Sequence, residues 1–209
     1  MNVKRFVNSI FTSNSYLIYF DDLPDTWIVD PGDSEPILDW IIINNKIPKG
    51  ILITHSHFDH IYGINQFIEK YSDISIYSSL EAKIGMQCSK LNASYYMEFP
   101  FTVESKNFKI ISNNDIVKLT YNLNAKVYYT PGHNNDCMTF LVGNYLFTGD
   151  ALIPGIKVHL KSKYSNKEQA QKSVSFIINF FDPNILLCPG HGDIISLDKI
   201  KNNEVSQNS

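Results

Sequence analysis

The stretch Thr54-His55-Ser56-His57-Phe58-Asp59-His60 constrains this chain more than any other part of its sequence. Three imidazoles and a carboxylate fall within six positions, directly after the apolar, strand-like run Gly50 to Ile53. A strand that ends in a turn points several such side chains into one small volume, and zinc and its neighbours bind these donor atoms. A single histidine is ordinarily a solvated or hydrogen-bonded residue. Four ligand-type residues together predict a metal site.

Three later loops each follow a strand-like run and carry one more ligand-type residue: Pro131-Gly132-His133, Thr148-Gly149-Asp150 and Pro189-Gly190-His191-Gly192. With the His-x-His-x-Asp-His pattern, their order and spacing resemble the metallo-β-lactamase superfamily over roughly residues 16 to 192. Five of the six histidines fall on motif positions. The resemblance implies an α/β (α+β) fold, a four-layer αββα sandwich of two mixed sheets with outer helices, with the ligands along one edge.

The resemblance also implies a centre with two Zn²⁺ ions per chain. One ion would be held by His55, His57 and His133, and the other by Asp59, His60 and His191. Asp150 would bridge the two ions. Metal coordination lowers the pKa of bound water towards about 7, so a hydroxide, oriented by Asp59, would be the nucleophile. The centre would carry about +1 charge, which favours anionic or strongly polarised substrates.

Asp150 discriminates among the enzymes of this superfamily. Zinc β-lactamases typically place a Cys ligand at this point, whereas a bridging aspartate resembles the hydroxyacylglutathione hydrolase (glyoxalase) branch, whose members cleave thioesters. A thiolate leaving group, with a thiol pKa of about 8.5, departs without full protonation, so no separate general acid is required. We therefore expect a dinuclear zinc hydrolase of a small ester, thioester or lactone, with Asp59 and Asp150 in catalytic positions. Because the chain ends about where that branch's glutathione-gripping extension would begin, glutathione recognition stays open.

Two other functions stay open on the sequence alone. His55, His133 and Asp150 can supply the two-His, one-carboxylate set of a mononuclear non-haem Fe²⁺ centre, as in a persulfide dioxygenase. The third possibility is a nuclease that processes RNA or DNA, or a non-catalytic binding module, on the same fold. The net charge of -3 and the pI near 6.0 argue against nucleic acid and against an anionic membrane as partners.

The composition predicts one globular domain. With 209 residues, 44% of them apolar and 19% charged, the chain can bury a single core over residues 1–200, and the polar stretch 201–209 is expected to fray. The N-terminus alternates apolar and polar residues and lacks the continuous apolar core of a signal peptide. Three widely spaced cysteines fit reduced thiols, so we expect a cytoplasmic protein acting on a small molecule, as a monomer or a homodimer.

Periodicity and turn residues predict the elements that would carry these loops. Strands are expected at Val3–Ile10, Tyr16–Phe20, Thr26–Val29, Gly50–Thr54, Ile74–Tyr77, Phe108–Ile111, Ile116–Leu119, Lys126–Thr130, Cys137–Val142, Tyr145–Thr148 and Ile185–Cys188. The first three would form an antiparallel meander. Helices are expected from Ser34, as the N-cap, to Asn45, directly after His60, and over Asn166–Phe181, whereas residues 79–102 would be irregular.

Several residues near the motifs have more ordinary roles. Asp30 is expected to support the turn beneath the metal site, and Asp59 to lie at a helix N-terminus whose dipole keeps it ionised. Cys137 is expected to be a buried structural thiol, and His159 a pocket wall or surface residue. The lysines that follow Asp150 are expected to form a solvated face: Lys157, Lys161, Lys163, Lys167, Lys172. The large apolar and aromatic residues of the irregular stretch are expected to be core, with a substrate lip as the second possibility: Met86, Tyr95, Tyr96, Met97, Phe99, Phe101.

Overall fold

The computed structural model describes residues 1–200, and the predicted tail at residues 201–209 lies outside the described residues. The chain divides into two compact units, the first spanning Met1–Ile111 and the second beginning at Ser112. The single domain expected over residues 1–200 stays a prediction. Among residues 1–200, no helix is both long and apolar enough to cross a membrane.

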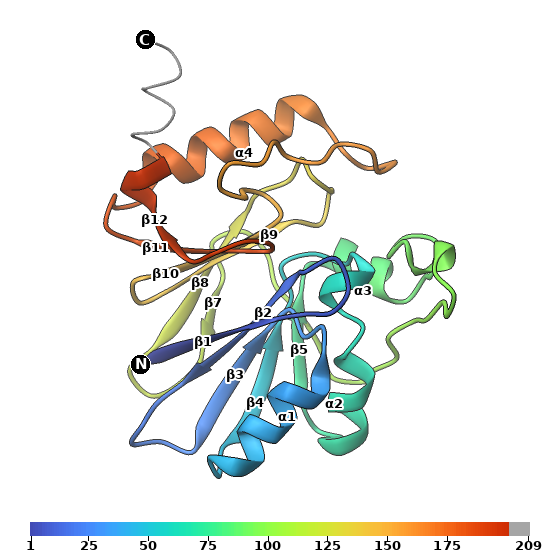
Figure 1. Ribbon diagram of the computed structural model, residues 1–209, viewed down its shortest axis with the longest axis vertical. Helices are drawn as coiled ribbons and strands as arrows, with labels where there is room; N and C mark the ends of the chain where they lie inside the picture. Colours follow the sequence, from blue (N-terminus) through green and yellow to red (C-terminus); the bar gives the residue numbers. More distant parts are fainter. Residues whose placement is uncertain (201–209) are drawn as a thin grey trace. The chain divides into compact units, whose positions relative to one another are not determined.

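The first unit is built on a six-stranded mixed sheet in the order β1-β2-β3-β4-β5-β6 (Figure 1). Its strands are β1 (Asn2–Val7), β2 (Asn14–Tyr19), β3 (Asp25–Val29), β4 (Ile47–Leu52), β5 (Ser75–Ser78) and β6 (Phe108–Ile110). The first three pair antiparallel, which confirms the predicted meander, and β3 to β6 run parallel. Parallel neighbours need crossover connections, which contain α1 (Ser34–Ile43), α2 (Ile64–Lys70) and α3 (Leu80–Met86).

The core of the first unit lies between this sheet and its helices. Ile37 and Ile41, one helical turn apart in α1, are fully buried in one cluster with Leu17, Ile28 and Ile51 of the sheet. This packing holds the carboxyl ends of β3 and β4 in place, and the ligand-bearing turns begin there.

The second unit contains a six-stranded mixed sheet in the order β12-β11-β10-β9-β8-β7. Its strands are β7 (Ile116–Lys118), β8 (Asn124–Tyr129), β9 (Met138–Val142), β10 (Tyr145–Gly149), β11 (Leu186–Pro189) and β12 (Ile195–Ser196). Only β10 and β11 pair in parallel, and α4 (Lys167–Phe180) lies in their crossover, along one face of the sheet (Figure 1). Ile177 of α4 is buried in one cluster with Leu146 and Leu187 of the sheet.

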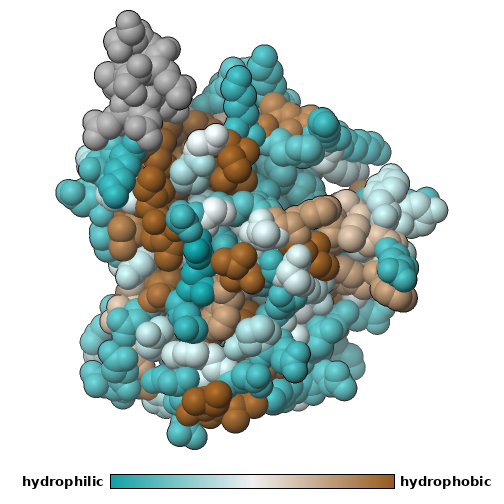
Figure 2. All heavy atoms as spheres, in the orientation of Figure 1, coloured by the Kyte–Doolittle hydropathy of each residue, from teal (hydrophilic) through white to brown (hydrophobic). Residues whose placement is uncertain are grey.

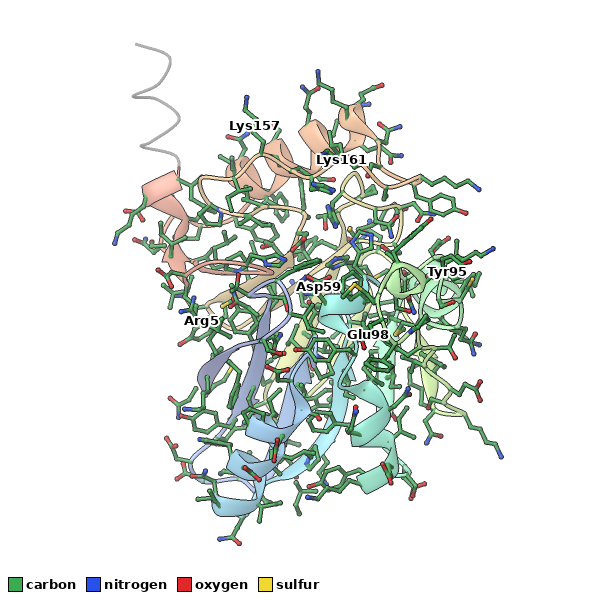
Figure 3. All side chains as sticks on the ribbon, turned by 45° about the vertical axis from the view of Figure 1, so that its right-hand side comes forward. Arg5, Asp59, Tyr95, Glu98, Lys157 and Lys161 are labelled. Atoms are coloured by element: carbon green, nitrogen blue, oxygen red, sulfur yellow. The ribbon has the colours of Figure 1, made fainter. Side chains whose placement is uncertain are left out.

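The prediction of an irregular stretch over residues 79–102 is wrong in part. This stretch contains α3 and the short 3-10 helix η2 (Ser94–Tyr96). Ser79 begins α3 as its N-cap, because its hydroxyl accepts a 3.0 Å hydrogen bond from the Ala82 amide. The expectation that the aromatics here are core is also wrong for three of them. Met86 is buried, but Tyr95, Tyr96 and Phe99 are exposed, and Figure 3 shows Tyr95 and Glu98 on the segment that follows α3.

The N-cap of α1 is Asp33, one residue before the predicted Ser34. The Asp33 carboxylate does not cap its own helix. Instead, it accepts hydrogen bonds from the Ser9 amide at 2.6 Å, the Ser9 hydroxyl at 2.8 Å and the Tyr62 hydroxyl at 2.5 Å. The helix ends before the predicted Asn45, because that residue takes a positive φ of 52°, outside the right-handed helical region.

Candidate metal centre

The ligand-bearing turn of the first unit follows β4 directly. His55 comes three residues after the strand ends, and η1 (Phe58–His60), a single turn of 3-10 helix, carries Asp59 and His60. His55 and His60 are fully buried and Asp59 is nearly so. The ring centroids of His55 lie 4.8 Å from His57 and 4.4 Å from His60. The sequence therefore folds into one compact cluster of three imidazoles and a carboxylate within this unit.

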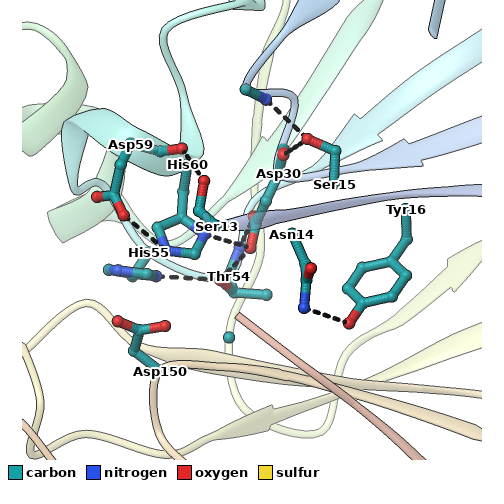
Figure 4. A network of polar contacts seen from close by, with 12 residues as sticks. Ser13, Asn14, Ser15, Tyr16, Asp30, Thr54, His55, Asp59, His60 and Asp150 are labelled. Atoms are coloured by element: carbon teal, nitrogen blue, oxygen red, sulfur yellow. Dashed lines mark hydrogen bonds and ion pairs between the residues drawn. The ribbon is translucent and has the colours of Figure 1, made fainter. Parts of the chain in front are cut away.

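Two hydrogen bonds from distant segments hold this turn. The Ser13 hydroxyl, from the turn between β1 and β2, donates to the Asp59 backbone carbonyl at 2.6 Å (Figure 4). The Phe58 amide donates to the Asn92 carbonyl at 2.8 Å. These contacts hold the backbone that carries Asp59 and His60.

Asp30 lies at the end of β3 and organises the polar groups beneath the turn (Figure 4). One carboxylate oxygen accepts the Thr54 amide at 2.7 Å, and the other accepts the Thr54 hydroxyl at 2.5 Å. Its Oδ2 also lies 3.5 Å from Nδ1 of His60. Burial raises the pKa of Asp30 above its ordinary value, while interactions with His60 and Thr54 oppose that shift. The predicted supporting role of Asp30 is confirmed.

The Thr54 hydroxyl sets the tautomer of His55. A threonine hydroxyl has one proton, and that of Thr54 is donated to Asp30. The 3.1 Å contact between Thr54 Oγ1 and His55 Nδ1 then requires Nδ1 to be the donor. His55 therefore carries its lone pair on Nε2, the form in which a neutral imidazole binds a metal.

The ring of His60 is oriented in the same way as that of His55. Its Nδ1 faces the Asp30 carboxylate, and its Nε2 lies 3.5 Å from Oδ2 of Asp59. Two donor atoms that bind one ion at about 2.0 to 2.2 Å are separated by about 3 to 3.6 Å, so this pair has the spacing of neighbouring ligands. Donor atoms of Asp30, His55 and His60 also lie within 4.8 Å of one another, but the Asp30 carboxylate accepts hydrogen bonds from Thr54 and so supports the two imidazoles instead of joining them as a ligand.

The expected helix-dipole support for Asp59 is wrong. The helix after the motif, α2, begins only at Ile64, and Gly63 is its N-cap. The chain turns first because the Gly63 amide donates to the Pro31 carbonyl at 3.0 Å. Any Cβ at Gly63 would lie 2.1 Å from the Gly32 carbonyl oxygen, so only glycine allows this approach. Asp59 is held by the short turn and by Ser13 rather than by an α-helix terminus.

In the second unit, the three predicted ligands follow strands that run in the same direction. His133 follows β8, Asp150 follows β10 and His191 follows β11. Antiparallel β9 lies between β8 and β10, and β10 is parallel to β11, so all three loops leave the same edge of the sheet. The Gly190 amide donates to the Gly149 carbonyl at 2.8 Å and ties two of these loops together.

One oxygen of Asp150 faces the two predicted ligand histidines of this unit. Oδ2 lies 3.6 Å from Nε2 of His133 and 3.6 Å from Nε2 of His191. These separations are too long for hydrogen bonds but match ligands that share an ion. Asp150 and His133 are nearly buried, and the side chain of His191 is 19% exposed. A carboxylate oxygen between two imidazoles can therefore bind a metal together with either of them.

The His133 loop is positioned by the start of α4. The Asn166 amide donates to the Gly132 carbonyl at 2.8 Å, and the Ser165 hydroxyl donates to the His133 carbonyl at 2.7 Å. Gly132 has φ of +139° and packs against α4, where a Cβ would lie 2.2 Å from the Ala170 amide nitrogen. Glycine is therefore required at this position for both conformation and space.

His159, the histidine outside the motif, contributes through its backbone. Nδ1 of His133 lies 2.9 Å from the His159 carbonyl oxygen. A carbonyl only accepts, so Nδ1 of His133 carries the proton and Nε2 the lone pair. The His159 side chain is exposed, as expected, and so are the five lysines of this region. Cys137 is buried, which confirms that expectation.

Sequence reasoning found the seven ligand-type residues but missed the groups that orient them. Thr54 was visible only as the residue before His55, and the His159 carbonyl leaves no mark in a side-chain pattern. The structure gathers His55, His57, Asp59 and His60 in the first unit, and His133, Asp150 and His191 in the second. The donor set in each unit fits a divalent metal that takes nitrogen and oxygen ligands.

Comparison with known proteins identifies the family. A model of the metallo-beta-lactamase superfamily matches residues 9–191. A hydroxyacylglutathione hydrolase from Buchnera aphidicola subsp. Baizongia pistaciae (strain Bp) is 32% identical over 155 residues, which cover 73% of this chain and 53% of that protein. The chain spans about half the length of the curated relatives it matches.

Solved structures show the same fold. BLEG-1 B3 metallo-beta-lactamase matches with a TM-score of 0.89 at 23% identity, over 96% of this chain and 97% of that chain. TTHA1623 in a di-iron-bound form matches with a TM-score of 0.79 at 21% identity, over 93% and 95% of the two chains. These likenesses concern the fold alone and confirm the predicted fold class. The chain belongs to the metallo-β-lactamase superfamily.

Proposed function

We propose that this protein is a metal-dependent hydrolase that cleaves a small ester, thioester or lactone at a centre of two Zn²⁺ ions. The observation that carries the proposal is the position of Asp150, whose single oxygen Oδ2 lies 3.6 Å from Nε2 of both His133 and His191. One ion would be held by His55, His57 and His133, and the other by Asp59, His60 and His191. Asp150 would touch both.

The orientation of the imidazoles supports this assignment. His55, His60 and His133 each direct Nδ1 to a group of the protein, respectively Thr54, Asp30 and the His159 carbonyl. Ligand histidines in metalloproteins usually donate their second nitrogen in this way, which fixes the ring and raises its basicity. Because the tautomers are already correct, binding an ion costs little rearrangement of these three side chains.

The two ions, when bound, supply a water of lowered pKa as the nucleophile. The protein supplies the carboxylates that surround this water. The Asp59 carboxylate, whose backbone is held by Ser13, would accept a hydrogen bond from that water and orient it. Burial of Asp59 and Asp150 excludes competing solvent and strengthens the electrostatic interactions of both carboxylates. A thiolate or alkoxide leaving group would be stabilised by the remaining positive charge of about +1.

The substrate class follows from these residues and from the relatives. Curated relatives are hydroxyacylglutathione hydrolases, which favours a thioester over a lactam. Asp150 also stands where the family resemblance would lead us to expect a Cys ligand in a zinc β-lactamase. We propose a small, anionic thioester or ester. The cytoplasmic location fits the three cysteines, none of which forms a disulfide within residues 1–200.

The second candidate is a mononuclear iron persulfide dioxygenase that uses His55, His133 and Asp150. A protein of the same fold, TTHA1623, is known in a di-iron-bound form, so the fold can hold iron, although that centre has two irons and this candidate has one. In that case the residues assigned to the second ion would not be needed to hold metal. A role with nucleic acid is disfavoured by the net charge of -3.

Metal analysis combined with a substrate panel separates these functions. Protein purified with and without oxygen is assayed for zinc and iron, and then for hydrolysis of thioesters, esters and lactones and for oxygen uptake with a persulfide. The proposal predicts about two zinc ions per chain and thioester hydrolysis that is independent of oxygen. One iron per chain with oxygen consumption would establish the dioxygenase instead. Hydrolysis without any bound metal would contradict both.

A further inference from the structure

A large cavity lies in the second unit, outside the cluster of His133, Asp150 and His191. It has a volume of about 870 Å³ and opens between the loop of residues 152–160 and one face of α4. Its lining residues all belong to this unit and are mostly aliphatic: Leu152, Ile153, Pro154, Ile156, Val158, Leu160, Ala170, Val174, Ile178, Ile195, Ile200. A volume of this size falls within the range of about 300 to 1,000 Å³ that small-molecule sites occupy.

Both walls of the cavity are fixed by the fold. The α4 wall consists of residues at helical spacing, including Ala170, Val174 and Ile178, which present one continuous stripe. In the opposite wall, the Leu152 carbonyl accepts the Thr148 hydroxyl at 3.0 Å, and Ile153 and Ile156 form a β-bridge. Figure 2 shows hydrophobic side chains gathered on this face, over the region of β12 in Figure 1.

The chemistry of the lining selects a narrow class of ligand. Residues 1–200 contribute no aromatic ring to the lining for a base or another planar group to stack on, and no carboxylate to bind a cation. The charged side chains that residues 1–200 contribute are Lys157 and Lys167. Both are exposed, and neither has an ion pair or hydrogen bond with any of residues 1–200. Aliphatic walls with two cationic groups complement a molecule that has a flexible hydrocarbon chain and one anionic head.

We propose that this cavity is a binding site for a fatty-acid-type anion, with the hydrocarbon chain against Ile153, Val174 and Ile178 and the carboxylate at Lys157 and Lys167. Burying the chain removes apolar surface of the cavity and of the ligand from water. The lysines then discriminate the anion from neutral or cationic amphiphiles. This site is separate from the proposed hydrolase chemistry and does not rest on it.

Binding of a homologous series tests the proposal directly. Octanoate, decanoate and dodecanoate, each below its micelle concentration, are titrated calorimetrically into the full-length, metal-loaded protein. Each buried methylene should tighten binding by about fourfold. Dodecanoate should bind at least about tenfold more tightly than dodecanol or dodecyltrimethylammonium, since only the carboxylate pairs with the lysines. Equal binding of all three head groups would overturn the assignment of Lys157 and Lys167.

Two matched pairs of variants locate the site. Ile156→Asp puts a carboxylate into the cavity wall at a side chain that is 59% exposed, and Ile116→Asp makes the same change on β7, also at 59% exposure. The first should weaken dodecanoate binding by more than about tenfold and the second should leave it unchanged. Lys157→Ala should weaken binding severalfold. Lys161→Ala, one residue beyond the loop of residues 152–160 and outside the lining, should not (Figure 3).

Three results would overturn the proposal. Unchanged binding in Ile156→Asp would place the fatty acid elsewhere. Binding that survives Ile156→Asp but is lost in Asp150→Ala would mean that the carboxylate binds the metals. Absence of binding, together with a dimer that Ile156→Asp converts to monomers in sedimentation, would make the cavity an interface between two copies of the chain.

Discussion

Nδ1 of His133 lies 2.9 Å from the backbone carbonyl oxygen of His159. This contact fixes the tautomer of His133, a predicted metal ligand, and does not involve the side chain of His159. We therefore predict that His159→Ala keeps the carbonyl and leaves the metal content close to that of the wild type. His133→Ala should lose metal from its site, because the imidazole itself is removed. Metal analysis of the two purified variants after identical dialysis checks this prediction. Equal metal loss in both would show that the His159 imidazole is itself required.

The Thr54 hydroxyl connects Asp30 to His55, so its removal should act on the metal without touching it. Thr54→Val keeps the shape of the side chain but removes the acceptor of the His55 Nδ1 proton and one donor to Asp30. Loss of such an outer hydrogen bond typically lowers metal affinity by about 10 to 100-fold. Competition with a chromophoric zinc chelator measures the change.

Thr54→Ser is the matched control for this experiment. It retains the hydroxyl, so the Asp30–Thr54–His55 chain of hydrogen bonds should survive, and the zinc affinity should stay within about threefold of the wild type. If Thr54→Val and Thr54→Ser bind zinc equally well, the tautomer of His55 is not set by Thr54.

Gly132 should be intolerant of any side chain. It combines φ of +139° with a Cβ position only 2.2 Å from the Ala170 amide nitrogen, a backbone atom that cannot rotate away. Gly132→Ala is expected to destabilise the protein by about 2 to 4 kcal/mol, measured by urea unfolding. Gly155 also has a positive φ, of +73°, but open space around it, so Gly155→Ala should cost only about 1 to 2 kcal/mol. Similar losses in the two variants would contradict the steric account.

The hydrogen bonds of the Asp33 carboxylate should make the stability of the protein depend on pH. Partial burial favours a higher pKa, but hydrogen bonds from Tyr62 and Ser9 outweigh it, and the pKa of Asp33 lies below its ordinary value. A depressed pKa in the folded state stabilises the protein above the unfolded pKa of about 4 and loses that contribution as pH falls through the folded pKa.

Asp33→Asn should therefore lower the free energy of unfolding by about 1 to 3 kcal/mol at pH 7. The difference from the wild type should shrink as the pH falls below about 4. Urea unfolding of both metal-free proteins between pH 7 and pH 3 provides the measurement. A difference that stays constant, or grows, on acidification would show that the Asp33 charge is not the cause.

The sequence predicted most of the fold because its strands are strongly patterned and its loops carry distinctive residues. Runs such as Trp27 to Val29 and Leu146 to Phe147 are buried strand segments whose neighbours in the sheet follow from chain order. The weakly patterned elements were missed. In α3, Leu80 and Ile84 are exposed, so the helix has no clean apolar stripe, and β12 has only two residues.

The ligand-type residues of the candidate site were visible in the sequence, but the groups that support them were not. His, Asp and their spacing are side-chain signals, and these marked all seven ligand-type residues. The Asp59 environment was mispredicted because apolar periodicity after His60 cannot reveal that Gly63 must approach Gly32 and delay the helix to Ile64. Contacts through a carbonyl, such as that of His159, depend on how the loop folds, and no residue type encodes them.

The central claim is that Asp150 bridges two metal ions, and its replacement tests this claim most directly. Asp150→Ala removes two metal bonds and leaves two dications without the carboxylate that screens them. Asp150→Ala is therefore expected to lose metal from both positions and to lower thioester turnover by more than about 100-fold. His191→Ala removes one ligand of one ion, and should mainly empty that position.

The deciding measurement is the zinc stoichiometry of the two variants, determined by elemental analysis beside the wild type and beside His159→Ala as an unaffected control. The account predicts about two ions per chain in the wild type, about one in His191→Ala and fewer than one in Asp150→Ala. If Asp150→Ala retains two ions with near-native turnover while His191→Ala loses both, Asp150 does not bridge and the centre holds a different arrangement.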